Sequence, residues 1–189
     1  MLDIHHIAKT FNPGTITEKV ALRDVDLHLN AGDFVTVIGG NGAGKSTVLN
    51  AVAGVFPVDA GTIEIDGVNV TNLPEYKRAK FLGRVFQDPM TGTAATMSIE
   101  ENMALAHRRG QRRSLKWGVS SEERRMFREA LAALELGLED RMNSKVGLLS
   151  GGQRQAVTLL MATLKRPKLL LLDEHTAALD PKTASKVLN

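Results

Sequence analysis

The 189-residue sequence contains no cysteine, so a disulfide framework and a thiolate metal site are both excluded. No stretch approaches the about 20 consecutive apolar residues that a helix needs to cross a bilayer. The N-terminus, "MLDIHHIAK", lacks the basic segment and apolar core of a signal peptide. We therefore expect a cytoplasmic chain that works at a membrane only through a partner.

The composition is that of an ordinary globular protein. Hydrophobic residues make up 43% of the chain and the mean hydropathy is −0.10, which argues against disorder. The net charge of +3 permits an acidic partner but does not require one. The length suffices for one good core or two subdomains.

Apolar patterning and turn residues divide the chain into strands, a helical segment, and a final strand and helix. Strands are predicted over 2–8, 21–29, 34–39, 84–88 and 168–174, with a hairpin over 61–70. Helices are predicted after the glycine loop as far as Pro57, then over 74–83, 98–107, 121–136 and 150–165, and from 180 onward, with Ser98 and Ser121 as N-terminal caps. This order predicts an α/β core with a helical subdomain inserted between Gln87 and the last strand.

The first glycine-rich loop, "GGNGAGKST", fits G-x-x-x-x-G-K-[ST] between an apolar strand and a helix. Its glycines allow the backbone to fold around phosphate oxygens, Lys45 reaches the β- and γ-phosphates, and the Ser46 hydroxyl suits Mg²⁺. A plain strand–turn–helix junction needs neither this lysine nor this hydroxyl. The dinucleotide fingerprint G-x-G-x-x-G does not occur here, which disfavours a nicotinamide or flavin enzyme.

Two acids follow the apolar run "LLLL". Asp173 stands where a strand delivers a carboxylate to a phosphate loop, to hold Mg²⁺ directly or through water. Glu174 is placed to act on an attacking water. The alternative is a surface pair that caps a strand, but the phosphate loop in the same chain favours the catalytic interpretation.

A second glycine turn, "LSGGQRQ", precedes another helix, where bare N–H groups and the helix dipole favour an anion. Together with "GGNGAGKST", "VFQDP", "LLLLDE" and "AALD", it makes the sequence resemble the ATP-binding cassette (ABC) ATPases over essentially the whole chain. A phosphate loop alone indicates only nucleotide binding, whereas "LSGGQ" upstream of "LLLLDE" is highly specific.

The resemblance implies a P-loop NTPase (RecA-like) α/β core with an N-terminal antiparallel β subdomain and an inserted helical subdomain. The core and β subdomain are expected over 1–88 and 157–189, and the helical subdomain over 89–156. The helical subdomain carries the signature loop, "LSGGQ", at Leu149–Gln153. The family also has a histidine after one further strand, beyond Asn189, so we expect the chain to be a C-terminally truncated piece with reduced activity.

The resemblance also implies a site for ATP and Mg²⁺ that two cassettes share, packed head to tail. Lys45, Gln87 and Glu174 resemble the family's catalytic residues, with Glu174 as general base, and Ser46, Gln87 and Asp173 resemble its Mg²⁺ ligands. Ala178, Leu179 and Asp180 resemble the loop that contacts the partner's site. The residues that resemble the ATP-binding positions are Phe11, Gly39, Gly40, Asn41, Gly42, Ala43, Gly44, Lys45, Ser46, Thr47, Ser150, Gly151, Gly152 and Gln153.

Two weaker signals leave alternatives open. Phe11 resembles the aromatic that stacks on adenine, but one aromatic is also consistent with a core or turn residue. The basic run over 108–117 suits nucleic acid or anionic headgroups, or simply a solvated linker between helices, which we favour. Segment 89–97 is small and flexible enough to line the groove that receives the permease.

The resemblance implies the ATP-hydrolysing subunit of a bacterial ABC transporter, at the cytoplasmic face of the membrane. The implied partners are a second, identical cassette, an integral membrane permease and an extracytoplasmic solute-binding protein, without direct contact to nucleic acid. Import is favoured, with a lean towards amino-acid uptake. The alternatives are a soluble ABC ATPase acting on the ribosome or DNA, and a non-catalytic nucleotide-sensing cassette.

Overall fold

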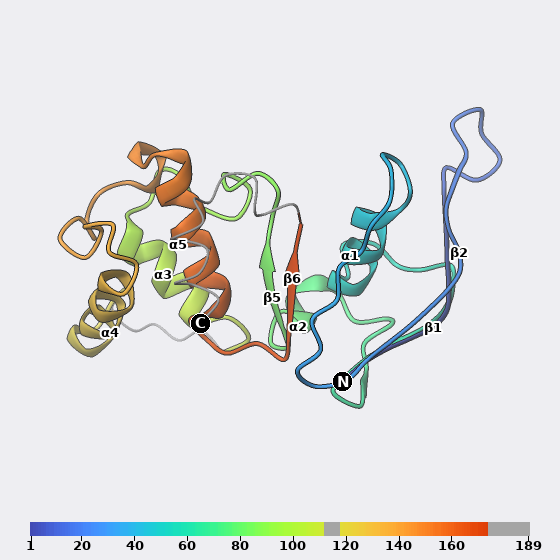
Figure 1. The fold of residues 1–189 in the computed structure, drawn as a ribbon, viewed down its shortest axis with the longest axis horizontal. Coiled ribbons are helices and arrows are strands. Elements are labelled where there is room, and N and C mark those ends of the chain that lie inside the picture. Colours follow the sequence, from blue (N-terminus) through green and yellow to red (C-terminus); the bar gives the residue numbers. More distant parts are fainter. Residues whose placement is uncertain (112–117, 174–189) are drawn as a thin grey trace. The chain divides into compact units, whose positions relative to one another are not determined.

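The computed structural model describes residues 1–111 and 118–173. The chain divides into two compact units, Met1–Leu82 and Gly83–Asn189, and each is described by itself (Figure 1). Within the described residues, no helix is both long and apolar enough to span a membrane.

An antiparallel sheet in the order β2-β1-β3-β4 forms the framework of the first unit. Figure 1 shows β1 and β2 running side by side along their length. Leu2, Ile4 and Ile7 of β1 are buried with Ile63 and Ile65 of β3, as expected for a sheet with one face against a core. The strands are β1 (Leu2–Phe11), β2 (Lys19–Leu29), β3 (Ala60–Ile65) and β4 (Val68–Asn69).

The predicted hairpin over 61–70 is confirmed. β3 pairs with β4 through Ile65 and Val68. Asp66 and Gly67 form the two-residue turn with φ of 55° and 73°. Two positive φ angles in succession characterise the type I′ turn that Asp-Gly favours.

Two helices complete the first unit, α1 (Lys45–Ala53) and α2 (Glu75–Arg78). The predicted helix over 74–83 therefore ends earlier, with Pro74 as its N-cap. Arg78 is only 2% exposed. Its guanidinium donates to the carbonyl oxygens of Ala51 and Val52, at 2.7 and 2.9 Å, so α2 holds the C-terminal end of α1.

The predicted buried strand over 34–39 is wrong for this structure. Residues 34–40 have no strand assignment, and the side chains of Phe34 and Ile38 are 85% and 89% exposed. An apolar run favours burial, but a strand also needs neighbours that supply its ladder hydrogen bonds. The described strands form two sheets, one of β1 to β4 and one of β5 (Leu82–Val85) and β6 (Leu169–Leu172), and neither sheet includes this segment.

The described part of the second unit contains three helices and a short 3-10 helix. α3 (Ile99–His107), α4 (Ser121–Ala132) and α5 (Gly151–Thr163) surround an apolar core, and the 3-10 helix η1 (Val146–Leu148) precedes α5. Figure 1 shows α3 beside α5. The fully buried members of this core are Ile99, Met103, Phe127, Leu131, Leu138, Val146, Ala156 and Val157.

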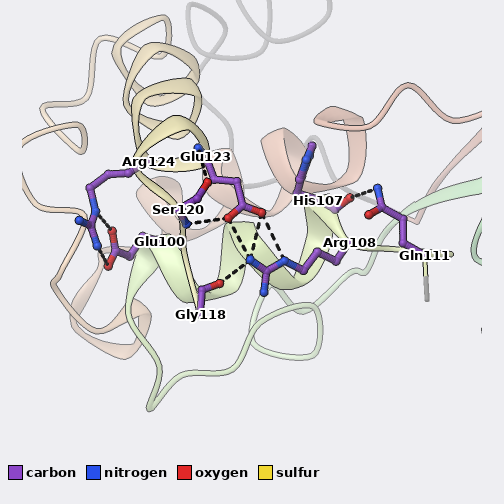
Figure 2. A network of polar contacts seen from close by, with 8 residues as sticks. All are labelled: Glu100, His107, Arg108, Gln111, Gly118, Ser120, Glu123 and Arg124. Carbon is purple, nitrogen blue, oxygen red and sulfur yellow. Dashed lines mark hydrogen bonds and ion pairs between the residues drawn. The ribbon is translucent and has the colours of Figure 1, made fainter. Parts of the chain in front are cut away.

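Polar contacts join α3 to α4 (Figure 2). Arg124 donates to both carboxylate oxygens of Glu100, at 2.8 and 3.1 Å. Arg108 pairs with Glu123 at 2.9 Å and also donates to the Gly118 carbonyl. Bidentate pairs of this kind fix orientation as well as distance.

The capping box predicted at Ser98 is confirmed, with Glu101 as its partner. The prediction of Ser121 as the cap of α4 is wrong by one residue. Ser120 is the N-cap and forms a capping box with Glu123, while Ser121 is the first helical residue. The spacing decides between the two serines, because Glu123 lies three residues after Ser120, as a capping box requires.

A two-stranded sheet of β5 (Leu82–Val85) and β6 (Leu169–Leu172) lies beside this helical core. The strands predicted over 84–88 and 168–174 are thus present with shifted or shortened bounds. The N–H of Asp173, just after β6, donates to the carbonyl of Val85, the last residue of β5, at 3.2 Å. The carboxyl ends of the two strands therefore lie together.

Candidate nucleotide-binding site

The phosphate loop, Gly39–Thr47, leads directly into α1. The N-cap is Gly44, with φ of 91°, and a Cβ there would lie 2.9 Å from the carbonyl oxygen of Ala21. Only glycine fits both the backbone angle and this close approach. The Nζ of Lys45 donates to the carbonyls of Gly39 and Gly40 at 2.7 and 3.1 Å, which holds the ammonium group within the turn of the loop.

The first turn of α1 suits an anion. It contains no acidic residue, whereas the first turns of α3 and α4 each carry two glutamates. A glutamate there satisfies the helix dipole internally and would repel a phosphate. The site therefore suits a nucleoside triphosphate, because it combines the Lys45 ammonium, the glycine turn and a helix N-terminus without acids.

The signature loop also precedes a helix without acids in its first turn. Ser150 is the N-cap of α5 and forms a capping box with Gln153, with both hydrogen bonds at 3.2 Å. Ser150, Gly151 and Gly152 are exposed, while Leu149 is 4% exposed and anchors the loop in the core. The turn is therefore held rigidly and presents its glycines to the outside.

Arg154 fixes the chain that precedes this turn, a role that the sequence interpretation missed. Its guanidinium donates to the carbonyls of Val146, Gly147 and Leu149 at 3.4, 3.2 and 2.9 Å. The signal in the sequence was the arginine of "LSGGQRQ", which lies one turn into α5. From this position the N–H groups of its planar guanidinium can donate to carbonyls in and beside the 3-10 helix that precedes the turn.

Gln87 and Asp173 follow the adjoining carboxyl ends of β5 and β6. Gln87 is exposed and Asp173 half-buried. The hydrogen bond from Asp173 N–H to Val85 brings the two segments together. An amide oxygen and a carboxylate at one sheet edge are oxygen donors of the kind that Mg²⁺ prefers. Ser46, the other predicted Mg²⁺ ligand, belongs to the first unit, whereas Gln87 and Asp173 belong to the second.

Phe11 ends β1 within a small cluster. Its ring meets that of Phe56 edge-on, with centroids 5.1 Å apart, and the ammonium of Lys9 lies 5.7 Å from its centroid. Lys9 also donates to Asp59 at 2.7 Å, and this hydrogen bond lowers the pKa of the Asp59 carboxyl. The cluster fixes the position of the Phe11 ring, which is half-buried. Phe56 had no distinguishing signal in the sequence.

Segment 89–97 is hydrogen-bonded to α3 through Asn102. Asn102 of α3 is 1% exposed. Its amide accepts from the N–H of Ala94 at 2.8 Å and donates to the carbonyls of Ala94 and Ser98 at 3.1 and 2.9 Å. Asn102 thus holds the loop that follows Gln87 against the helical core.

The described part of the basic run is engaged in helix packing. Arg108 pairs with Glu123, and Arg109 donates to the carbonyls of Ala162 and Lys165 at the end of α5, at 3.2 and 3.0 Å. The solvated linker favoured above is therefore wrong for these two arginines. The remainder of the run, 112–117, lies outside the described residues, as do Glu174, Ala178, Leu179 and Asp180.

Comparison with known proteins decides the family. The sequence profile described as "ABC transporter" matches residues 22–177, which include the phosphate loop, the signature loop and both acids. The chain belongs to the ABC transporter family. This confirms the resemblance and places the chain among ATP-hydrolysing cassettes.

Curated relatives match the whole chain. It is 42% identical to a "Tyrosine transport ATP-binding protein" of Clostridioides difficile (strain R20291), over 100% of this chain and 74% of that protein. It is 38% identical to a methionine import ATP-binding protein of Sodalis glossinidius (strain morsitans), of which it covers 52%. The chain thus spans about half to three quarters of the length of these relatives.

Solved structures confirm the fold class. The cassette MJ0796, as a dimer in a post-hydrolysis state bound to ADP and Pi, superposes with a TM-score of 0.84 at 31% identity, over 100% of this chain and 80% of that one. A nucleotide-free cassette from an ABC transporter gives 0.77 at 28% identity, with 74% of its length covered. The chain described here is therefore also an α/β P-loop NTPase with an antiparallel β subdomain.

Proposed function

We propose that this cassette is the ATP-hydrolysing subunit of an importer and drives a separate membrane permease. The observation that supports this most strongly is the exposed signature turn, Ser150–Gly152, at the acid-free N-terminus of α5, in addition to the phosphate loop before α1. A second exposed turn suited to an anion is consistent with a site completed by a second molecule.

In this proposal, the phosphate loop holds the β- and γ-phosphates. The ammonium of Lys45 moves from the carbonyls of Gly39 and Gly40, where it now donates, to the phosphate oxygens. The backbone N–H groups of the first turn of α1 face the same oxygens. Transfer of the phosphoryl group to water depends mainly on such positioning and charge stabilisation.

Hydrolysis in the proposed site needs a metal ion and a base. Ser46, Gln87 and Asp173 would hold Mg²⁺, which neutralises charge on the β- and γ-phosphates when bound. Glu174 takes a proton from the attacking water. Each aligned donor to the developing charge contributes about 2.7–4 kcal/mol to lowering the barrier.

Two cassettes are proposed to pack head to tail, so that each ATP lies between the phosphate loop of one and the signature turn of the other. ATP then closes the dimer, and hydrolysis reopens it. The dimeric form of the MJ0796 cassette supports this arrangement. It also gives a reason for two glycine turns in one small chain, because each is half of a composite site.

The permease and an extracytoplasmic solute-binding protein complete the proposed complex, with the cassette bound at the cytoplasmic face of the membrane. Relatives named for tyrosine transport and methionine import support the lean towards amino-acid uptake, while others are named for polyamine or phosphonate import.

The experiment that tests this function is affinity purification of the full-length Glu174→Gln protein from detergent-solubilised cells with ATP. Without its base, the cassette is expected to bind ATP and remain closed on its partners. Lys45→Ala, which loses phosphate binding, is the matched control. We expect a polytopic membrane protein with Glu174→Gln and much less of it with Lys45→Ala.

The membrane protein identified in this way is then purified with the wild-type cassette and reconstituted in vesicles, and ATP turnover is measured with amino acids, polyamines and phosphonates in turn. Stimulation by an amino acid supports the proposed solute class, and stimulation only by another class removes it. Recovery of ribosomes or DNA without a membrane protein would overturn the transporter function and favour a soluble ABC ATPase. Wild-type turnover by Glu174→Gln would remove Glu174 as the base.

A further inference from the structure

The outer face of the β1–β2 hairpin carries a cluster of histidines and aspartates that the nucleotide site does not use. The cluster consists of His5 and His6 on β1 and of Asp24 and Asp26 on β2, and all four side chains are exposed. We call it the His-Asp cluster.

Two β-bulges, one on each strand, bring these side chains together. Between the pairs Ile4–Leu27 and Ile7–Val25, β1 has two residues where β2 has one, so His5 and His6 both lie opposite Asp26. In the next step along the ladder, the extra residue is on β2, at Arg23 and Asp24. A bulge redirects side chains that would otherwise alternate between the faces of the sheet.

At each bulge, a residue other than glycine adopts the left-handed region of backbone conformation. The φ angle is 52° at His6 and 47° at Asp24. Histidine and aspartate tolerate this region better than most residues. Both side chains are exposed, so the left-handed backbone goes with the bulges and not with burial of either side chain.

The resulting geometry is close to that of a metal site. The Nδ1 of His6 lies 2.7 Å from Oδ1 of Asp24 and 3.4 Å from Oδ2 of Asp26, and one ligand atom from each of these residues lies within 4.8 Å of the others. Ligands about 2.1 Å from a zinc ion stand about 3.0–3.4 Å from each other at octahedral or tetrahedral angles. The Nδ1 of His5, 4.0 Å from Oδ1 of Asp26, is the nearest further donor.

We propose that the His-Asp cluster binds a divalent transition-metal ion, with His6, Asp24 and Asp26 as ligands and His5 as the fourth donor. The donor set determines the kind of ion. Imidazole nitrogen with carboxylate oxygen suits Zn²⁺, Ni²⁺ and Cu²⁺, whereas Mg²⁺ prefers oxygen ligands alone. The site is therefore distinct in chemistry from the one that serves ATP.

The backbone supports the arrangement of the cluster. The main-chain N–H of His6 donates to Oδ1 of Asp26 at 3.0 Å. This hydrogen bond occupies one oxygen of that carboxylate and leaves the other, Oδ2, on the side of the His6 ring. A hydrogen bond from outside the ligand set orients a ligand before the metal arrives.

Titration of the purified protein with Zn²⁺ by calorimetry tests the proposal, in the absence of nucleotide and with excess Mg²⁺ to occupy oxygen sites. Wild type is expected to bind one Zn²⁺, and His6→Gln and Asp24→Asn are each expected to weaken binding about tenfold or more. Both substitutions are at exposed positions, so the fold is expected to persist, and circular dichroism checks this.

The matched control is His28→Gln. His28 contacts Asp3 on the same hairpin, but within the described residues this pair has no third histidine, cysteine or carboxylate close enough to complete a metal-ligand group. The control is expected to bind Zn²⁺ as wild type does. The proposal is overturned if wild type shows no saturable binding, if His6→Gln binds unchanged, or if His28→Gln loses binding to the same extent. The close contacts would then be ion pairs only.

Discussion

Replacement of Arg78 by methionine tests how the first unit holds the helix that follows the phosphate loop. The guanidinium donates to the carbonyls of Ala51 and Val52 at the end of α1. It also donates to Thr71 and Leu73 in the loop before α2, at 2.9 and 2.8 Å. Burial lowers the pKa of this arginine, but its charge persists at any ordinary pH.

The magnitude follows from the two buried hydrogen bonds. Methionine fills a similar volume but donates nothing, so the carbonyls of Ala51 and Val52 lose this partner in a region closed to water. A hydrogen bond to a charged group contributes about 1.5–3 kcal/mol. At the lower value the two buried bonds give a loss of about 3 kcal/mol. The half-buried bonds to Thr71 and Leu73 add less, since water can replace them.

The assay is urea denaturation, with the free energy of unfolding taken from the midpoint and slope. Lys77→Met, at an exposed site on the same helix, is the control and is expected to stay within about 0.5 kcal/mol of wild type. Because the nine residues of α1 span about 13 Å, Lys45 lies far from Arg78. Folded Arg78→Met is therefore expected to keep its ATP affinity. A loss below about 0.5 kcal/mol would refute the argument.

Three further predictions concern the nucleotide site and the helical unit. Phe11→Ala is expected to raise the Kd for ATP about 5- to 150-fold, as loss of stacking worth about 1–3 kcal/mol implies; unchanged affinity in a fluorescent-nucleotide titration would leave Phe11 as a packing residue against Phe56. Arg154→Ala is expected to lower ATP turnover without changing ATP binding by the monomer, because the signature turn loses its clamp; an equal loss in both assays would contradict this. For Glu123→Gln, hydrogen bonds from Ser120 and Arg108 lower the pKa of Glu123 in the folded protein below its ordinary 4.5. The ionised carboxylate therefore stabilises the fold fully above pH 4.5, and this contribution is lost as the pH falls through the lowered pKa. The melting temperature of Glu123→Gln should therefore lie below that of wild type at pH 7, and the difference should shrink below pH 4.5; a constant difference would show that the charge is unimportant.

The sequence predicted most where function depends on short motifs. The glycine loop before α1 and the serine-capped start of α5 lie where expected, because local chemistry determines both. The Asp66-Gly67 turn follows for the same reason. These features need only the backbone angles that glycine permits and the hydrogen bonds that serine supplies.

Contacts between segments that are distant in the chain could not be predicted from the sequence. No motif in the sequence marks Arg78, yet its guanidinium donates to carbonyls 26 and 27 residues away. The apolar run 34–39 predicted a buried strand, but hydrophobicity does not determine which strands a segment will join. The two bulges that form the His-Asp cluster also depend on the register of β1 against β2, for which a single strand has no signal.

The central claim is that each ATP site is composed of two chains, and mixing two inactive variants tests it most directly. Lys45→Ala removes the phosphate loop's cation, and Gly151→Asp places a negative charge on the signature turn. A side chain at position 151 meets no atom within 4 Å, so this variant is expected to fold. A mixed dimer then holds one doubly damaged site and one intact site. We predict that each full-length variant alone is inactive and that the mixture recovers turnover, up to about a quarter of wild type, since about half of the dimers are mixed. A mixture as inactive as its components would contradict the account.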